Sequence, residues 1–253
     1  MSDPRFRWAR SLARLVLGAF DLPVVARTSP AVADLTPGAV VVVNGGGLFE
    51  LLTVLVAFPH PVRFVLPPGC FRWPLVGRVL AGMGHLPFEP GRDGRSLVRR
   101  GRGLFRTGGH VGVFCPDPAA ALSPGLQFAA RLAWRARCPV VPLALFGLDA
   151  ILPPGHRLPR VGTLRARVGD PFRMPVEPTR RPGAEIRRLA TEIRERLLGL
   201  PDPLLEPPPG PEGRMPGPAD TAGGGGTTDR PSLPPFPPDP SPPDDRGEMG
   251  GNP

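Results

Sequence analysis

Four consecutive valines, residues 40–43, constrain the fold of this 253-residue chain more than any other feature. Valine is β-branched, and a continuous apolar run of this kind is typical of a strand that is buried on both faces of a sheet. Asn44 and three glycines follow, and the segment "LFELLTVLVAF" then has the length and apolar period of a helix. The order of strand, tight loop and helix is the arrangement in which α/β enzymes often place their chemistry.

Strand and helix signals continue to alternate along the chain. This alternation predicts a single α/β domain with a largely parallel sheet flanked by helices. Further strands are expected at 61–67, 85–88, 110–117, 139–147 and 163–172, and further helices at 71–84, 94–109, 125–138 and 183–200. The strand at 163–172 differs from the others because its apolar and polar residues alternate.

Composition divides the chain into three parts. Residues 1–24 are expected to form an amphipathic helix at a membrane interface, residues 25–200 the α/β domain, and residues 201–253 a disordered tail. Proline and glycine (40 and 33 residues in all) are densest in the tail, where they make up 27 of 53 residues. A segment with so few aliphatic residues cannot bury enough surface to offset its chain entropy.

The segment 5–20 fits a short basic helix with one apolar face. At helical spacing, Arg7, Arg10 and Arg14 group opposite the apolar side, and Phe6 and Leu17 fall away from it. Basic, tryptophan-bearing helices of this type lie in the plane of a membrane interface. The apolar face consists of Trp8, Leu12, Leu15, Val16 and Ala19.

Charge favours an anionic partner. The tail holds three arginines and nine acidic residues, a net charge of −6, so the remainder of this +9 chain carries +15. Such a domain is attracted to phospholipid surfaces, phosphorylated substrates or nucleic acid. Three widely spaced cysteines indicate no zinc pattern and no disulfide framework, and no apolar run reaches 18 residues. We therefore expect a cytoplasmic protein, peripheral to the inner face of the cell membrane.

The glycine loop at 45–47 does not satisfy either of two common phosphate-binding motifs or the oxyanion-hole motif of esterases. A dinucleotide site needs G-x-G-x-x-G, and a P-loop needs a lysine, which this chain lacks altogether. An esterase would combine an H-G-G-G turn with a G-x-S-x-G elbow, and "ALSPG" around Ser123 does not supply one. The backbone N–H groups of Gly46 and Gly47 remain candidate donors for a phosphate or carboxylate.

From about residue 10 to 175 the chain resembles the glycerolipid acyltransferases, the family of 1-acylglycerol-3-phosphate acyltransferase. In that family a buried strand ends in an Asn-His-x4-Asp motif, whose histidine is the general base and whose aspartate orients it. The resemblance aligns the motif's first position with Asn44, its histidine with Gly45 and its aspartate with Glu50. It therefore implies an acyltransferase framework from which the base is missing.

Later segments follow the same family order. The passage 64–91 has the family's cadence of proline and spaced glycines at Pro74, Gly77 and Gly84, with Pro90 near an expected arginine. In "FCPDPAAA", Pro116 and Asp117 match the start of a Phe-Pro-Glu-Gly-Thr-Arg motif thought to contact the acceptor's phosphate, but "PAA" replaces Gly-Thr-Arg. "SPGLQFAARLAWRARCPVVPLAL" and "VGDPF" match the closing passages. The resemblance implies substrate-binding roles for Asn44, Gly46, Gly47, Pro116 and Asp117.

Three hypotheses remain open. The first is an acyltransferase-like protein with impaired catalysis that binds lysophospholipid or acyl lipid at an anionic membrane surface. The second is an active enzyme with a substituted base, His85 or His110, using acyl-CoA or acyl carrier protein as donor and no metal or other cofactor; Cys115 is a candidate nucleophile. The third is an unrelated protein that binds nucleic acid or another polyanion, although "RRGRGLFR" at 99–106 carries no RNA-binding signature.

Overall fold

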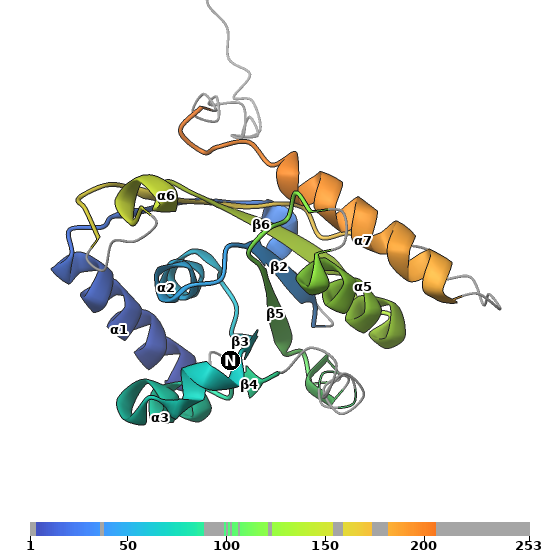
Figure 1. The fold of residues 1–253 in the computed structure, drawn as a ribbon, viewed down its shortest axis with the longest axis horizontal. Coiled ribbons are helices and arrows are strands. Elements are labelled where there is room, and N and C mark those ends of the chain that lie inside the picture. The colour runs from blue at the N-terminus through green and yellow to red at the C-terminus, as the bar shows by residue number, and fades with distance from the viewer. Residues whose placement is uncertain are drawn as a thin grey trace, which may run out of the picture. The chain divides into compact units, whose positions relative to one another are not determined.

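Seven strands form one sheet in the order β1-β7-β6-β2-β5-β3-β4 (Figure 1). The computed structural model describes residues 4–35, 38–88, 99, 101, 103–105, 107–120, 123–153, 159–173 and 182–205. Neighbouring strands are parallel except β6 and β7, which run antiparallel. The strands are β1 (Val24–Thr28), β2 (Val40–Asn44), β3 (Val62–Leu66), β4 (Leu86–Pro87), β5 (His110–Cys115), β6 (Val140–Phe146) and β7 (Leu164–Val168).

The valine run is the central strand, β2. It pairs with β5 on one side, Val40 opposite Val111, and with β6 on the other, Val40 opposite Val140. The side chains of all four valines are fully buried. Val40 and Val42 belong to one apolar core and Val41 and Val43 to the other, so both faces of this strand are covered.

Helices cover the two faces of the sheet (Figure 1). Residues of α5 and α7 pack with Val40 and Val42, whereas residues of α1, α2 and α3 pack with Val41 and Val43. The α-helices are α1 (Pro4–Ala19), α2 (Leu48–Ala57), α3 (Pro74–Gly82), α5 (Pro124–Ala136), α6 (Leu148–Ile151) and α7 (Pro182–Leu198), with 3-10 turns η1 (Pro30–Val32) and η2 (Pro68–Arg72).

Helix α1 is attached to the domain by a face that the sequence does not single out. Its buried residues are Ala9, Ala13 and Leu17, so Leu17, expected off the apolar face, points into the core. Arg10 donates from Nη2 to the carbonyl of Val56 at 2.6 Å. A cation at the carboxyl end of α2 is favourable because unpaired carbonyls concentrate negative charge there.

The outer face of α1 carries large apolar side chains. Trp8 is 56% exposed and Leu15 70% exposed, and both belong to the apolar face expected from the sequence. Alanines on the inner side allow close approach to α2, while the bulky residues point outward. No helix of the described chain is both long and apolar enough to cross a membrane.

The structure confirms the predicted fold class, a mixed α/β domain with a mostly parallel sheet flanked by helices. The sequence did not predict β1 or the one-turn helix α6. Its alternating strand, β7, is the one that reverses direction. Of the expected basic helix at 94–109, residues 99, 101 and 103–105 are described as helical. Residues 201–205, assigned to the tail, are described, and Asp202 pairs with Arg165 at 3.0 Å; the rest of the tail lies outside the described residues.

Candidate functional site

The glycine loop lies at the carboxyl end of β2, where parallel strands place their loops. Asn44 is opposite Cys115, the last residue of β5, and the N–H of Gly45 donates to the Cys115 carbonyl at 3.1 Å. This bond extends the ladder by one residue before the chain turns toward α2. Ligands of open α/β sheets bind beyond the carboxyl ends of the strands, so the loop occupies a favourable position for a site.

Asn44 uses its side-chain amide to hold the sheet together. Its Nδ2 donates to the carbonyl of Leu145 at 2.8 Å, and its Oδ1 accepts from the Leu145 N–H at 2.6 Å. The side chain thereby continues the β2–β6 pairing where the two strands separate. It does not cap α2, whose N-cap is Gly47 without a side-chain hydrogen bond.

Gly45 has a backbone conformation that glycine favours. Its φ angle is +91°, and a Cβ at this position would lie 2.8 Å from Cγ of Glu50. Side chains of L-residues rarely adopt this backbone geometry, and no Cβ is accommodated at such a contact distance. A larger residue at position 45 would be strained by this φ angle and would require the Glu50 side chain to move.

The Glu50 carboxylate folds back onto the glycine loop. Oε1 accepts a long hydrogen bond from the N–H of Gly46 at 3.4 Å, and Oε2 lies 2.5 Å from where a Cβ on Gly47 would be. Glu50 is in the first turn of α2 and is half-buried. The positive amino end of the helix favours an anion in this position.

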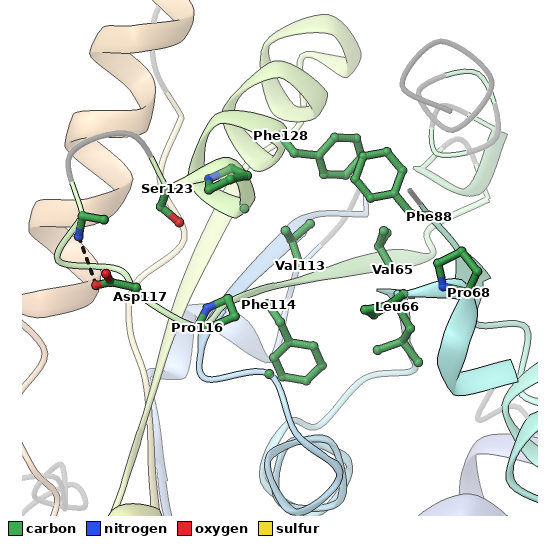
Figure 2. A pocket seen from close by; sticks show the side chains of 15 residues that line it. Val65, Leu66, Pro68, Phe88, Val113, Phe114, Pro116, Asp117, Ser123 and Phe128 are labelled. Carbon is green, nitrogen blue, oxygen red and sulfur yellow. Dashed lines mark hydrogen bonds between the residues drawn. The ribbon is translucent and has the colours of Figure 1, made fainter. Parts of the chain in front are cut away.

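A large apolar cavity of about 650 Å³ opens beside the loop (Figure 2). Gly46 contributes to its wall, and Asp117 is the one charged side chain among the lining residues that the structure describes. Val65 of β3 and Val113 of β5 point into it from the sheet (Figure 2). The lining residues are Gly46, Val65, Leu66, Pro67, Pro68, Phe88, Val113, Phe114, Pro116, Asp117, Ala120, Ser123, Pro124, Gly125 and Phe128.

Two aromatic rings stand together in the wall of the cavity. Phe88, just after β4, and Phe128, on α5, have ring centroids 4.4 Å apart (Figure 2). Phe128 is only 7% exposed, and both rings pack with the core on the α5 side of the sheet. Sequence reasoning missed both residues, because they belong to different elements and only the fold brings them together.

The segment after β5 forms another part of the wall. Pro116 and Asp117, to which the resemblance gives substrate-binding roles, both line the cavity. The Asp117 carboxylate accepts from the N–H of Ala120 at 3.1 Å, which closes the turn that follows (Figure 2). None of the described lining residues is basic, so none of them is an arginine of the kind the family motif would provide. Pro90 lies outside the described residues.

Cys115 is unsuited to nucleophilic attack. Its side chain is fully buried, and burial raises the pKa of the thiol to about 12, although a hydrogen bond with Ser123 acts in the opposite direction. The thiolate is the nucleophilic form of cysteine, so a pKa this high leaves it almost unpopulated at neutral pH. Cys115 and Ser123 instead form a buried polar contact beside the cavity.

His85 lies in the core beside β3. Its Nδ1 accepts the backbone N–H of Phe64 at 2.8 Å, and the residue is 4% exposed. Burial, and secondarily the charge of Arg63, lowers the pKa of His85 to about 4. Strands β5 and β3 separate this position from the end of β2, so the structure does not bring His85 to the glycine loop.

His110 lies at the amino end of β5, whereas the glycine loop lies at the carboxyl ends of the strands. It begins β5, and its Nδ1 accepts the N–H of Ala39, just before β2, at 3.1 Å. Burial, and secondarily the charge of His60, lowers the pKa of His110 to about 4. Five residues separate it from Cys115, which at strand spacing is roughly 16 Å. Neither candidate replacement base therefore reaches the glycine loop.

Comparison with known proteins identifies the fold. The chain matches no protein-family model, and no curated protein matches it significantly in sequence. Among solved structures, it is similar to the 1-acyl-sn-glycerophosphate (LPA) acyltransferase PlsC from Thermotoga maritima, with a TM-score of 0.59 and 17% sequence identity. The similarity covers 76% of this chain and 77% of that one, so the two share an acyltransferase fold. No group of three or more potential metal ligands occurs within the described part of the chain.

Proposed function

We propose that this protein is a glycerolipid acyltransferase-like protein that binds acyl lipids at a membrane surface, with acyl transfer impaired at its motif positions. The observation that carries the proposal is the apolar cavity beside the Asn44–Gly45 loop. The cavity lies at the carboxyl ends of β2, β3 and β5, on the fold shared with the 1-acyl-sn-glycerophosphate acyltransferase. Lysophospholipid or another acyl lipid is the proposed ligand.

The cavity lining suits an alkyl chain. Its walls are valine, leucine, proline, alanine and phenylalanine, with Ser123 and Asp117 as the side-chain polar groups. Each methylene moved from water into such a site contributes about 0.8 kcal/mol of favourable free energy. A chain of several methylenes thus provides substantial binding without any charged partner inside the cavity.

Impairment follows from Gly45 and Glu50. A glycine cannot accept a proton, and general-base assistance accelerates a reaction typically by about 10²–10⁴-fold. Glu50 retains a carboxylate but has no imidazole to orient. Whatever transfer remains would draw on an acyl-CoA or acyl carrier protein donor, and the proposal requires no metal or other cofactor.

Helix α1 supports the membrane part of the proposal. Its outer face presents Trp8 and Leu15, and each is preceded in the sequence by an exposed arginine, Arg7 or Arg14. Phe20, just beyond the helix, is 40% exposed and contacts Phe49 of α2 with ring centroids 5.8 Å apart. Exposed Leu48 adjoins the glycine loop in the same turn of α2. An apolar surface with a basic border suits a bilayer with anionic headgroups.

We place the protein at the cytoplasmic, inner face of the cell membrane, where anionic headgroups would meet the +15 region of residues 1–200. No structural observation favours nucleic acid over lipid. A preference for duplex DNA or RNA over anionic vesicles at equal salt would contradict this assignment.

Co-sedimentation with vesicles tests the proposal. Wild-type protein should bind vesicles of phosphatidylglycerol and phosphatidylcholine and retain a photoactivatable lysophosphatidate. On irradiation, this lipid should label residues of the cavity. Leu15→Glu should weaken vesicle binding at least tenfold, because the charge must enter the interface. Leu198→Glu on α7, where the leucine is 50% exposed, is the matched control and should bind normally. Equal binding by both variants would exclude α1 as the contact surface.

A further inference from the structure

The carboxylate of Glu50 occupies the space that a side chain at position 45 would enter. A Cβ on Gly45 would lie 2.8 Å from Cγ of Glu50 and 3.0 Å from Oε1. A base attached at position 45 would therefore begin where the Glu50 side chain now ends. The space beside Gly45 is thus filled by the carboxylate of Glu50.

Two features allow this placement. Glutamate is one methylene longer than the aspartate that the resemblance assigns to this position, so its carboxylate extends further from α2. Gly45 and Gly47 have no side chains to obstruct it, and a Cβ at either would lie within 3.0 Å of Glu50. Glu50 is therefore matched to the glycines around it.

The carboxylate is also close to the cavity. Gly46, whose N–H contacts Oε1 of Glu50 at 3.4 Å, is a lining residue. A hydrogen bond of this length is weak. Oε1 of Glu50 can therefore accept a second, shorter hydrogen bond from another donor. A hydroxyl group at the cavity mouth would be such a donor.

We propose that Glu50 acts as the general base of a residual acyl transfer, in place of the absent histidine; this rests on the proposed acyl-lipid function. The carboxylate takes the proton of the acceptor hydroxyl as its oxygen attacks the carbonyl carbon of an acyl thioester. The C–O bond forms, the C–S bond breaks, and the proton passes from Glu50 to the departing thiolate. The products are an ester and a free thiol, and the carboxylate is regenerated.

A carboxylate is a weaker base than imidazole, which fits a slow reaction. General-base efficiency rises with basicity toward the working pH, so exchanging histidine for glutamate lowers the rate without abolishing assistance. The alternative role for Glu50 is to cap α2 electrostatically, as acidic residues in a first turn commonly do. The two roles differ in one measurable respect, since capping does not affect acyl transfer in a folded, lipid-binding protein.

The test uses two variants of the site in the full-length chain. Glu50→Gln keeps the shape and an oxygen acceptor but removes the base. Gly47→Ala leaves Glu50 intact and displaces it, because the new Cβ would lie 2.5 Å from Oε2 while the extended backbone at Gly47 (φ −102°, ψ −176°) accepts alanine. The matched controls are Glu195→Gln, exposed on α7, and Gly183→Ala, where the Cβ is 3.7 Å from its neighbour.

Transfer from radiolabelled palmitoyl-CoA to lysophosphatidate in anionic vesicles is measured together with retention of photoactivatable lysophosphatidate. We expect Glu50→Gln to lower kcat roughly 10²-fold, and Gly47→Ala at least roughly tenfold, with lipid retention unchanged in both folded variants. Both controls should match the wild type.

Three results would overturn the assignment. One is transfer that survives Glu50→Gln. Another is wild-type protein that retains lysophosphatidate but shows no transfer, which would leave the lipid-binding proposal standing and reduce Glu50 to a helix cap. The third is failure to retain lysophosphatidate, which would remove the proposed function together with the base.

Discussion

Asn44 and Leu145 are joined by two hydrogen bonds, one accepted and one donated by the same side-chain amide, across strands separated by a hundred residues of chain. The pair fixes the end of β2, and with it the starting point of the glycine loop. Every later feature of the site depends on that position, because Gly45 begins its turn at the next residue.

Replacing Asn44 by aspartate should destabilise the fold. The carboxylate would still accept the Leu145 N–H, but it would face the Leu145 carbonyl without a proton to donate. A buried, unpaired carbonyl and the nearby charge should lower the free energy of unfolding by about 2–3 kcal/mol. Urea denaturation at pH 7 measures this effect.

Acidification provides the control for that variant. The protonated form of Asp at position 44 can donate to Leu145, so the difference from wild type should shrink as the pH falls toward 4. A penalty that does not change with pH would show that lost packing, rather than the missing donor, causes the effect.

Restoring histidine at position 45 should not restore a working base. Gly45→His introduces a side chain at φ +91° and a Cβ 2.8 Å from Cγ of Glu50, and a non-glycine residue in this region costs of order 1–3 kcal/mol. The variant should melt at a lower temperature and show no gain in transfer. Adding Glu50→Ala should recover part of the stability by removing the contact but not the strain. A fully stable and more active Gly45→His would show that neither the backbone strain at position 45 nor the contact with Glu50 limits this variant.

Filling the cavity should reduce lipid binding without unfolding the protein. Ala120 lines the cavity on the turn after β5, and Ala119 is exposed beside it without lining the cavity. Ala120→Phe should weaken retention of photoactivatable lysophosphatidate at least tenfold, because the ring competes with the alkyl chain for the same volume. Ala119→Phe is the matched control and should retain lipid normally. Equal retention by the two variants would place the lipid elsewhere.

The two buried histidines should make the fold sensitive to acid. The pKa values of His85 and His110 are lowered to about 4 in the folded protein from 6.5. The unfolded chain therefore binds more protons between pH 6.5 and pH 4, and stability present above pH 6.5 is lost as the pH falls. Each histidine contributes up to about 1.4 kcal/mol per pH unit within that window.

Substitution separates the two contributions. His85→Gln keeps an acceptor for the Phe64 N–H but cannot take up a proton, so the slope of unfolding free energy against pH should fall by about half of the histidine contribution. His60→Gln, at a half-buried histidine, is the variant whose slope is compared with that of His85→Gln. An unchanged slope in His85→Gln would mean that His85 contributes nothing to the acid sensitivity of the fold.

The sequence was sufficient to predict the centre of the fold. Four valines in succession are typical of a strand that is buried on both faces, and β2 is buried in that way. Strand β1 could not be predicted because "VVART" lies at a sheet edge, with three of its five residues exposed. The inner face of α1 was missed because small residues, Ala9 and Ala13, make the contact, while bulky Trp8 and Leu15 dominate the apolar pattern.

The site was predictable in position but not in geometry. The sequence pattern placed Gly45 directly after a buried strand and Glu50 in the helix that follows, and the structure has both residues there. Nothing in the residue types shows that Glu50 turns back into the loop, or that Asn44 bonds to Leu145 and not to α2. The histidines were candidates only because an imidazole can act as a base. The topology places His110 at the amino end of β5, away from the loop at the carboxyl ends of the strands.

The pairing of β1 with β7 has a consequence for the order in which the chain assembles. Val24 lies opposite Leu164, so β1 is synthesised well before β7, the strand with which it pairs. Long-range parallel pairing of this kind is slow to form and leaves apolar surface uncovered meanwhile. During synthesis, α1 emerges before any of this sheet is complete, with its inner face also lacking a partner. A nascent chain of this protein therefore offers an amphipathic helix to chaperones or lipid well before it has a folded domain.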